Sequence, residues 1–156
     1  MKKALLIIVP VLVCFAVGFL SSIVQEESIR TWYVGLNKAP LTPPNMVFPV
    51  VWGILYTLMG ISVGLILNRF FVSATAKLAV GLFAAQLVFN VLWSVTFFYL
   101  KNPVSALIVI LILEALLCCY AFFSYKIQKA SSYLFIPYIL WVAFATYLNI
   151  YVLMYN

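Results

Sequence analysis

The sequence predicts an all-α integral membrane protein, folded as a bundle of five transmembrane helices. Hydrophobic residues make up 67% of the 156 residues, charged residues only 8%, and the mean hydropathy is +1.20. A water-soluble domain typically has about a quarter of its residues charged. This chain has too few charged residues to cover the surface of a water-soluble domain. Five apolar runs each approach the roughly 20 residues that a helix needs to cross a bilayer. They cover residues 4–24, 46–67, 77–98, 103–125 and 132–154.

The short connections between these runs decide the domain organisation. They leave no room for a soluble domain, a long linker or a low-complexity segment, and no internal repeat of the transporter type is visible. We therefore expect residues 1–156 to form a single domain.

The first run, residues 4–24, follows two lysines, as both signal peptides and transmembrane helices do. The run is long for a signal peptide and lacks an obvious small-x-small cleavage site before Ser21, so we expect a retained helix. Five spans put the termini on opposite faces of the membrane, and the positive-inside rule then predicts a cytoplasmic N-terminus and an external C-terminus. The N-terminal face carries Lys2, Lys3, Arg69, Lys77, Lys126 and Lys129, against Arg30, Lys38 and Lys101 on the other.

The longest connection, residues 25–45, combines aromatic and basic residues with prolines. Proline fixes φ and disfavours helix before it, which predicts a semi-rigid extended segment. Such a segment suits a lid over the end of the bundle, but an interfacial aromatic belt has the same composition. The lid residues would be Arg30, Trp32, Tyr33, Lys38, Pro40, Pro43 and Pro44.

The second run places Trp52 and Tyr56 one helical turn apart, on the face that also holds Gly60. Gly60 and Gly64 also form a GxxxG pattern, which favours close approach of another helix. We therefore expect a face that carries both aromatic side chains and a packing surface.

The third run has two different surfaces. Asn90 and Trp93 share a polar and aromatic face with Gln86, which suits the inside of the bundle because an amide facing lipid is costly. Gly81 and Ala85 lie nearly opposite Asn90 and form a small-xxx-small pattern. This second surface suits either a neighbouring subunit or a neighbouring helix, and a homodimer is the hypothesis that follows from the first.

The fourth run places Glu114 near mid-membrane, where a carboxylate costs on the order of 3 kcal/mol. Glu114 is either a proton- or ligand-binding group, or a neutral acid hydrogen-bonded to another helix. Pro103 follows Asn102 and suits the first position of this helix. The fifth run carries Trp141 and Phe144 on one stripe, with the small residue Ala145 beside the rings. Such a stripe is ordinarily core, but the small neighbours also favour a cavity.

Missing residue types narrow the chemistry. There is no histidine, which removes the usual general base and the commonest metal ligand. The three cysteines lie in apolar runs without a CxxC spacing, and there is no aspartate. We therefore expect no metal site, no paired-carboxylate hydrolysis and, without a basic patch that holds exposed aromatics, no nucleic-acid binding.

Four motifs occur in order along the chain. They are Trp32-Tyr33 with Lys38 and Pro40, Pro49-Val50-Val51-Trp52-Gly53, Gln86-Leu87 with Asn90 and Trp93, and Pro137-Tyr138 with Trp141 and Phe144-Ala145. Together these motifs resemble the TspO/MBR family, the bacterial tryptophan-rich sensory proteins and the mitochondrial translocator protein, or peripheral benzodiazepine receptor. The resemblance runs nearly end to end and is consistent with a bacterial cytoplasmic membrane.

The resemblance implies a five-helix bundle, commonly dimeric, with a pocket between the first, second, third and fifth helices beneath the first long loop. It implies no bound cofactor; protoporphyrin IX would be a ligand or substrate, and isoquinoline carboxamides, benzodiazepines and membrane lipid would be further partners. The resemblance also matches Trp52 and Trp141 to tryptophans linked to light- and oxygen-dependent porphyrin degradation. The ligand-binding residues carried over are Trp32, Trp52, Tyr56, Asn90, Trp93, Trp141, Phe144 and Ala145.

One family feature is absent. A sterol-recognition pattern needs a basic residue after its tyrosine, and residues 148–156 contain none. Three functions remain open: a receptor, sensor or carrier for tetrapyrroles, a light-dependent porphyrin-degrading enzyme, and a membrane interaction scaffold. The scaffold would depend on Gly81 and Ala85 more than on the tryptophans.

Overall fold

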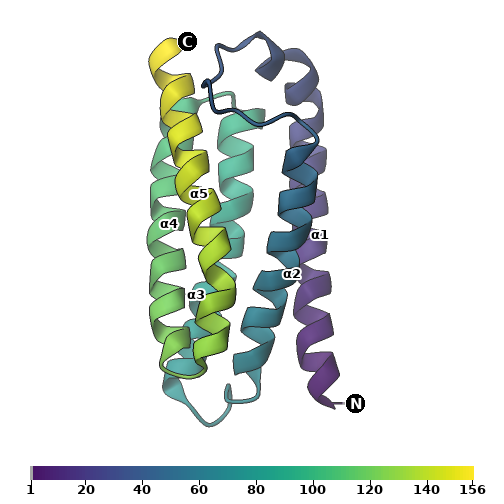
Figure 1. Ribbon diagram of the computed structural model, residues 1–156, viewed down its shortest axis with the longest axis vertical. Coiled ribbons are helices and arrows are strands. Elements are labelled where there is room, and N and C mark those ends of the chain that lie inside the picture. The colour runs from purple at the N-terminus through teal and green to yellow at the C-terminus, as the bar shows by residue number, and fades with distance from the viewer. Residues whose placement is uncertain (1) are drawn as a thin grey trace.

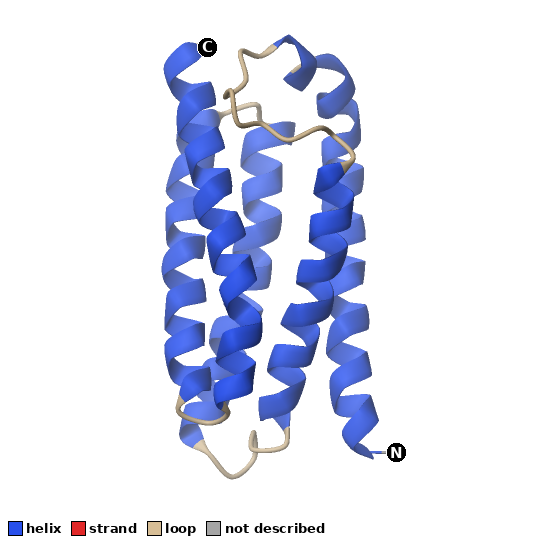
Figure 2. Cartoon of the chain, in the orientation of Figure 1, coloured by secondary structure: helices blue, strands red, loops and turns tan. Residues whose placement is uncertain are grey.

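The computed structural model describes residues 2–156, with side chains from residue 4 onwards, and confirms the all-α, five-helix fold. The side chains of Lys2 and Lys3, which enter the charge count, lie outside that description. Figure 1 shows long antiparallel helices with the two termini at opposite ends, and Figure 2 shows the loops that join them. The helices are α1 (Lys2–Thr31), α2 (Val47–Leu67), α3 (Ala74–Ser94), α4 (Pro103–Tyr125) and α5 (Lys129–Tyr155).

All five helices are long and apolar enough to cross a membrane. α4 begins as the sequence predicts, because Asn102 caps it by accepting a 3.0 Å hydrogen bond from the Ser105 peptide N–H, with Pro103 in the first turn. α3 begins at Ala74, earlier than expected, because Ser73 caps it through the Ala76 peptide N–H.

α1 extends to Thr31, seven residues beyond the expected end at Val24. Its last two turns are polar but hold their helical form through local bonds. Arg30 pairs with Glu26 at 2.8 Å, and the Thr31 hydroxyl donates to the Glu27 carbonyl at 2.8 Å. The connection between the first two helices is therefore shorter than residues 25–45, and Arg30 belongs to the helix.

α1 and α2 approach closely at the glycine pair of α2. A β-carbon added at Gly60 would overlap Val11, and one at Gly64 would lie 2.6 Å from the Leu6 carbonyl oxygen. Pro10 has no N–H to donate to the Leu6 carbonyl within α1, so that carbonyl remains free to face Gly64. This is the close packing that the GxxxG pattern predicts.

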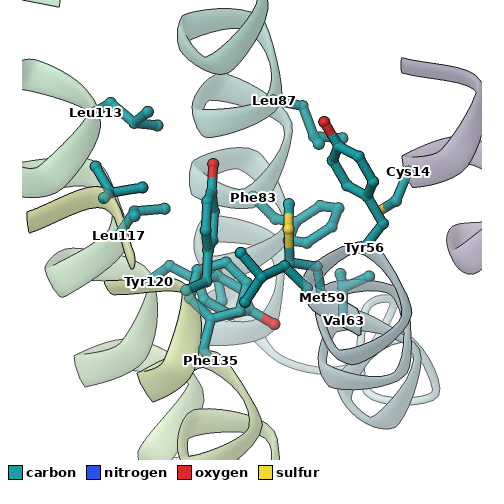
Figure 3. Close-up of a cluster of buried hydrophobic side chains, with 14 of the residues drawn as sticks. Cys14, Tyr56, Met59, Val63, Phe83, Leu87, Leu113, Leu117, Tyr120 and Phe135 are labelled. Atoms are coloured by element: carbon teal, nitrogen blue, oxygen red, sulfur yellow. The ribbon is translucent and has the colours of Figure 1, made fainter. Parts of the chain in front are cut away.

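The hydrophobic core fills the half of the bundle that lies nearest to the N-terminus of the chain. Figure 3 shows the side chains that meet there, among them Met59, Phe83, Tyr120 and Phe135. The Tyr120 and Phe135 ring centroids are 4.3 Å apart. The Tyr120 hydroxyl is 2.9 Å from the Ser62 hydroxyl, which is the polar partner that a buried tyrosine needs. The other half of the bundle is packed differently and holds the site described below.

α3 ends in a π-helical turn, η2 (Val95–Tyr99). The Leu100 peptide N–H donates to the Val95 carbonyl at 2.9 Å, which widens the last turn. The turn places Phe97 and Phe98 in a second buried cluster with Ala106 of α4 and Val152 of α5, and Ile29 near the end of α1 packs against it. This cluster closes the bundle at the end opposite the main core.

Candidate functional site

A cavity of about 510 Å³ lies between α1, α2, α3 and α5, in the half of the bundle towards the C-terminus. The segment after α1 (residues 32–46, here called the lid) passes over this end of the bundle, as Figure 1 shows, and Lys38, Ala39 and Thr42 of the segment line the cavity. None of the described residues that line it belongs to α4. Its position is the one that the family resemblance implies. Its volume falls in the roughly 300–1,000 Å³ range of small-molecule sites.

Aromatic rings form much of the cavity wall. Trp52 stacks on Tyr56, with ring centroids 5.2 Å apart and planes 27° apart. Trp93 stacks on Phe97 at 5.4 Å and 22°. All four residues line the cavity, so two helices each present a stacked aromatic pair to it. Flat surfaces of this kind suit a flat, largely apolar ligand.

Trp141 completes the wall on α5. Its ring lies 5.8 Å from that of Phe48, nearly edge-on at 72°. Ala145, one turn further along α5, also lines the cavity and leaves room beside the indole. Trp141 is therefore held on one side by α2 and faces open space on the other.

Buried polar groups hold the Trp93 indole and tie the helices around the cavity together. The Trp93 indole N–H donates to the Asn149 side-chain oxygen at 3.2 Å, and the Asn149 amide donates to the Pro103 carbonyl at 2.9 Å. Asn90 donates to the Tyr138 hydroxyl oxygen at 2.7 Å. These bonds join α3 to α5 and α5 to α4, so the Trp93 indole is oriented before any ligand arrives.

The lid contributes the cationic side chain of the site. Lys38 lines the cavity, and its ammonium nitrogen lies 4.8 Å from the centre of the Tyr33 ring. Tyr33 also lines the cavity and packs on Phe98 at 5.7 Å. Burial raises the pKa of the Tyr33 hydroxyl above its ordinary value. No acidic residue occurs among the described residues of the wall, so the cavity has a positive bias.

Asparagine side chains fasten the lid to the end of α5. The Asn37 peptide N–H donates to the Asn156 side-chain oxygen at 2.8 Å, and the Asn37 amide donates to the Tyr155 carbonyl at 2.9 Å. The Asn156 amide donates back to the Asn37 carbonyl at 3.2 Å. The lid is thus tied to a helix that itself forms part of the cavity wall.

Not every residue predicted for the lid faces the cavity. Arg30 is exposed and paired with Glu26 on α1. Pro40, Pro43 and Pro44 shape the segment without lining the cavity, and the buried Ala39 lies against it instead.

Of the eight predicted ligand-binding residues, the structure brings six together around the cavity: Trp52, Tyr56, Asn90, Trp93, Trp141 and Ala145. The other two lie behind the wall. Trp32 packs edge-on against Phe97 at 5.6 Å, and Phe144 packs on Trp141 at 5.7 Å. Both support rings that line the cavity rather than lining it themselves.

The family resemblance implies that α1 forms part of the pocket, but the individual α1 residues that line it were not predicted from the sequence. Gly18, Ser21 and Gln25 line the cavity, and Gln25 donates to the Ser94 hydroxyl at 2.8 Å. The Ser21 hydroxyl oxygen is buried and has no hydrogen-bond partner among the described residues. The sequence does contain a signal for these residues, because small and polar side chains recur at helical spacing within an otherwise apolar run.

Two predicted features lie away from the cavity. Gly81 is exposed on α3, and a β-carbon there would meet nothing within 4 Å, whereas Ala85 is half-buried. Glu114 is half-buried on α4, and its buried Oε2 has no hydrogen-bond partner among the described residues. The hydrogen bond to another helix that one interpretation of Glu114 requires is therefore not present at that oxygen.

Comparison with known proteins agrees with the four motifs. The TspO/MBR family model matches residues 10–155. The tryptophan-rich protein TspO of Chlorobaculum tepidum is 33% identical, over 99% of this chain and 98% of its own length. The protein of that name from Archaeoglobus fulgidus is 36% identical over 92% of each chain. The translocator protein of Homo sapiens is 36% identical over 90% of this chain and 81% of its own. The chain therefore belongs to the TspO/MBR family.

Proposed function

We propose that this protein is a membrane receptor, sensor or carrier that binds tetrapyrroles, represented by protoporphyrin IX, in the cavity beneath the lid. The observation that carries the proposal is the pair of stacked aromatic walls, Trp52 on Tyr56 and Trp93 on Phe97, around one 510 Å³ space. A macrocycle offers two broad faces, and aromatic rings bind such faces through area and quadrupole interactions.

The charge of the site supports an anionic ligand. Lys38 is a cation on the wall, and the described wall holds no carboxylate to neutralise it. A porphyrin propionate near the lid would pair with the Lys38 ammonium group while the ring lies deeper, among the aromatics. The same cavity suits isoquinoline carboxamides and benzodiazepines, whose flat rings need the aromatic walls and whose carbonyls need the amide or hydroxyl donors.

A second candidate function is light- and oxygen-dependent degradation of the bound porphyrin. Its support is that Trp52 and Trp141, the two tryptophans that the resemblance links to this reaction, both line the same cavity. Both indoles would then lie beside an excited macrocycle as electron donors.

The third candidate, a membrane scaffold, and the homodimer both depend on α3. The exposed Gly81 on its outer face leaves room for another helix to approach. We propose that the protein lies in the bacterial cytoplasmic membrane with its N-terminus in the cytoplasm, as the count of basic residues favours.

Titration of protoporphyrin IX into the purified protein tests these functions. Saturable tryptophan quenching in the dark, with no bleaching under illumination, supports the receptor or carrier. Bleaching that Trp52→Phe and Trp141→Phe abolish supports the enzyme. Absence of saturable quenching contradicts both, and a change of oligomeric state in Gly81→Leu would then support the scaffold.

A further inference from the structure

A second hollow lies on the outside of the bundle, between α2 and α5. It measures about 360 Å³, and six apolar residues line it: Val51, Ile54, Leu55, Pro137, Leu140 and Trp141. Ile54 and Leu140 are 55% and 65% exposed, so the hollow opens on the surface that faces lipid. We call it the α2–α5 groove.

Trp141 belongs to both hollows. It lines the groove and the internal cavity, whereas the other five groove residues do not line the cavity. Small residues lie beside it on the cavity side. Ala145 lines the cavity one turn along α5, and a β-carbon at Gly53 of α2 would meet nothing within 4 Å. The Trp141 indole is therefore the bulky group shared by the wall of the cavity and the wall of the groove.

The chemistry of the groove selects its occupant. Its helices both span the membrane, and none of its six side chains except the indole carries a polar atom. A water molecule needs two to four polar partners, and a peptide or drug-like amide would lose its hydrogen bonds there. A hydrocarbon chain loses nothing, and bilayer lipid supplies one at this depth.

We propose that the α2–α5 groove is a lipid acyl-chain site and the membrane-side portal of the cavity, with Trp141 as the gate between the two. Rotation of one indole would join the compartments, so an apolar ligand dissolved in the bilayer would enter without crossing water. The water-side route passes the lid, which Asn37 and Asn156 hold in place. The portal rests on the proposed function, since it assumes a membrane-soluble ligand, but the acyl-chain site does not.

Single-tryptophan variants test the site and the gate without any added ligand. The chain has four tryptophans, so one variant keeps only Trp141 and another keeps only Trp52, with Phe at the other three positions. Both are reconstituted in phosphatidylcholine vesicles with bromine, a contact quencher, at the middle of the acyl chains. We expect Trp141 to lose most of its emission and Trp52 to keep most of its emission.

Opening the gate should change this pattern. Replacing the phenylalanine at position 141 of the Trp52-only variant by alanine removes the shared wall, and bromine should then quench Trp52. The melting temperature of each variant identifies any that misfolds. The Trp141-only variant tests the acyl-chain site without any substitution at position 141. Emission from Trp141 that bromine leaves unchanged overturns the proposal.

Exchange kinetics test the portal. Ile54→Trp fills the groove without touching the cavity, and Ile108→Trp on α4 is a matched control, because Ile108 is 58% exposed. Binding of protoporphyrin IX is followed by the absorbance of the porphyrin. Ile54→Trp should slow association and dissociation about tenfold each, which corresponds to a barrier increase of about 1.4 kcal/mol. The Kd should not change.

The outcomes separate the two proposals. Rates equal to those of the unmodified protein in Ile54→Trp, with binding intact, overturn the portal and leave the proposed function standing. If no variant binds protoporphyrin IX, the proposed function fails, and the bromine experiment alone decides whether the groove and the gate exist.

Discussion

Asn90 of α3 donates a 2.7 Å hydrogen bond to the hydroxyl oxygen of Tyr138 on α5, at the boundary between the cavity and the packed core. Asn90 lines the cavity, while Tyr138 is 1% exposed and belongs to the core. The bond gives a polar side chain in a membrane-spanning helix a partner that does not depend on a ligand. It also holds α3 and α5 at a fixed separation below the aromatic walls.

Tyr138→Phe should lower the free energy of unfolding by about 1–3 kcal/mol, because it leaves the Asn90 amide without its acceptor. Thermal unfolding in detergent, followed by circular dichroism, measures the change. Adding Asn90→Leu should recover part of the loss, since both polar groups are then absent. Tyr147→Phe, at an exposed position, is the control. Equal stability of Tyr138→Phe and the unmodified protein would contradict the assignment.

Gly60→Ala should destabilise the protein by about 1–3 kcal/mol, because the added β-carbon would overlap Val11 where α1 meets α2. Gly53→Ala on the same helix is a matched control, since a β-carbon there meets nothing within 4 Å. The control should be neutral or stabilising by up to about 1 kcal/mol, because alanine favours helix over glycine. Equal melting temperatures for the two variants would show that α1 and α2 pack less closely than described.

Lys38→Met should weaken protoporphyrin IX binding about fivefold, close to 1 kcal/mol, through loss of one partly screened ion pair. The dimethyl ester of protoporphyrin, which has no carboxylate, should bind both proteins equally. Arg30→Met is the control, because Arg30 is paired with Glu26 outside the cavity. If Lys38→Met weakens binding of the ester and of the free acid equally, Lys38 acts by shaping the lid and not by its charge.

The helices and the aromatic faces were predictable because both follow from periodicity. Apolar runs of bilayer length predict the spans, and Trp52 with Tyr56, or Asn90 with Trp93, fall on one face at helical spacing. Helical spacing does not say how far a face turns towards its neighbours. Phe144 therefore lies behind Trp141, although Ala145 beside it in the sequence lines the cavity.

Other features depend on contacts between distant parts of the chain. The π-helical turn η2 places Phe97 against Trp32, and no local pattern around either residue specifies that contact. The resemblance implies that α1 forms part of the pocket, but it names no residue there. The helical spacing of Gly18, Ser21 and Gln25 marks one face of α1, whereas the helices that this face meets are set by distant parts of the chain.

Tyr33 predicts a pH dependence of the lid. Burial raises the pKa of its hydroxyl in the closed lid above the value of about 10 in an open, solvated segment. The closed form therefore binds the phenolic proton more tightly. Protonated Tyr33 therefore stabilises the closed form fully below about pH 10. This stabilisation is lost as the pH rises through the raised pKa, because the open form is then favoured by ionisation of the hydroxyl.

We expect the lid to open more often above about pH 10 in the unmodified protein. Modification of the thiol of Ser21→Cys, in a background without the native cysteines, reports this opening, since residue 21 is buried against the cavity. Tyr33→Phe has no phenolic hydroxyl to ionise and should lose most of the increase. If the increase with pH is the same in both proteins, the opening does not depend on Tyr33.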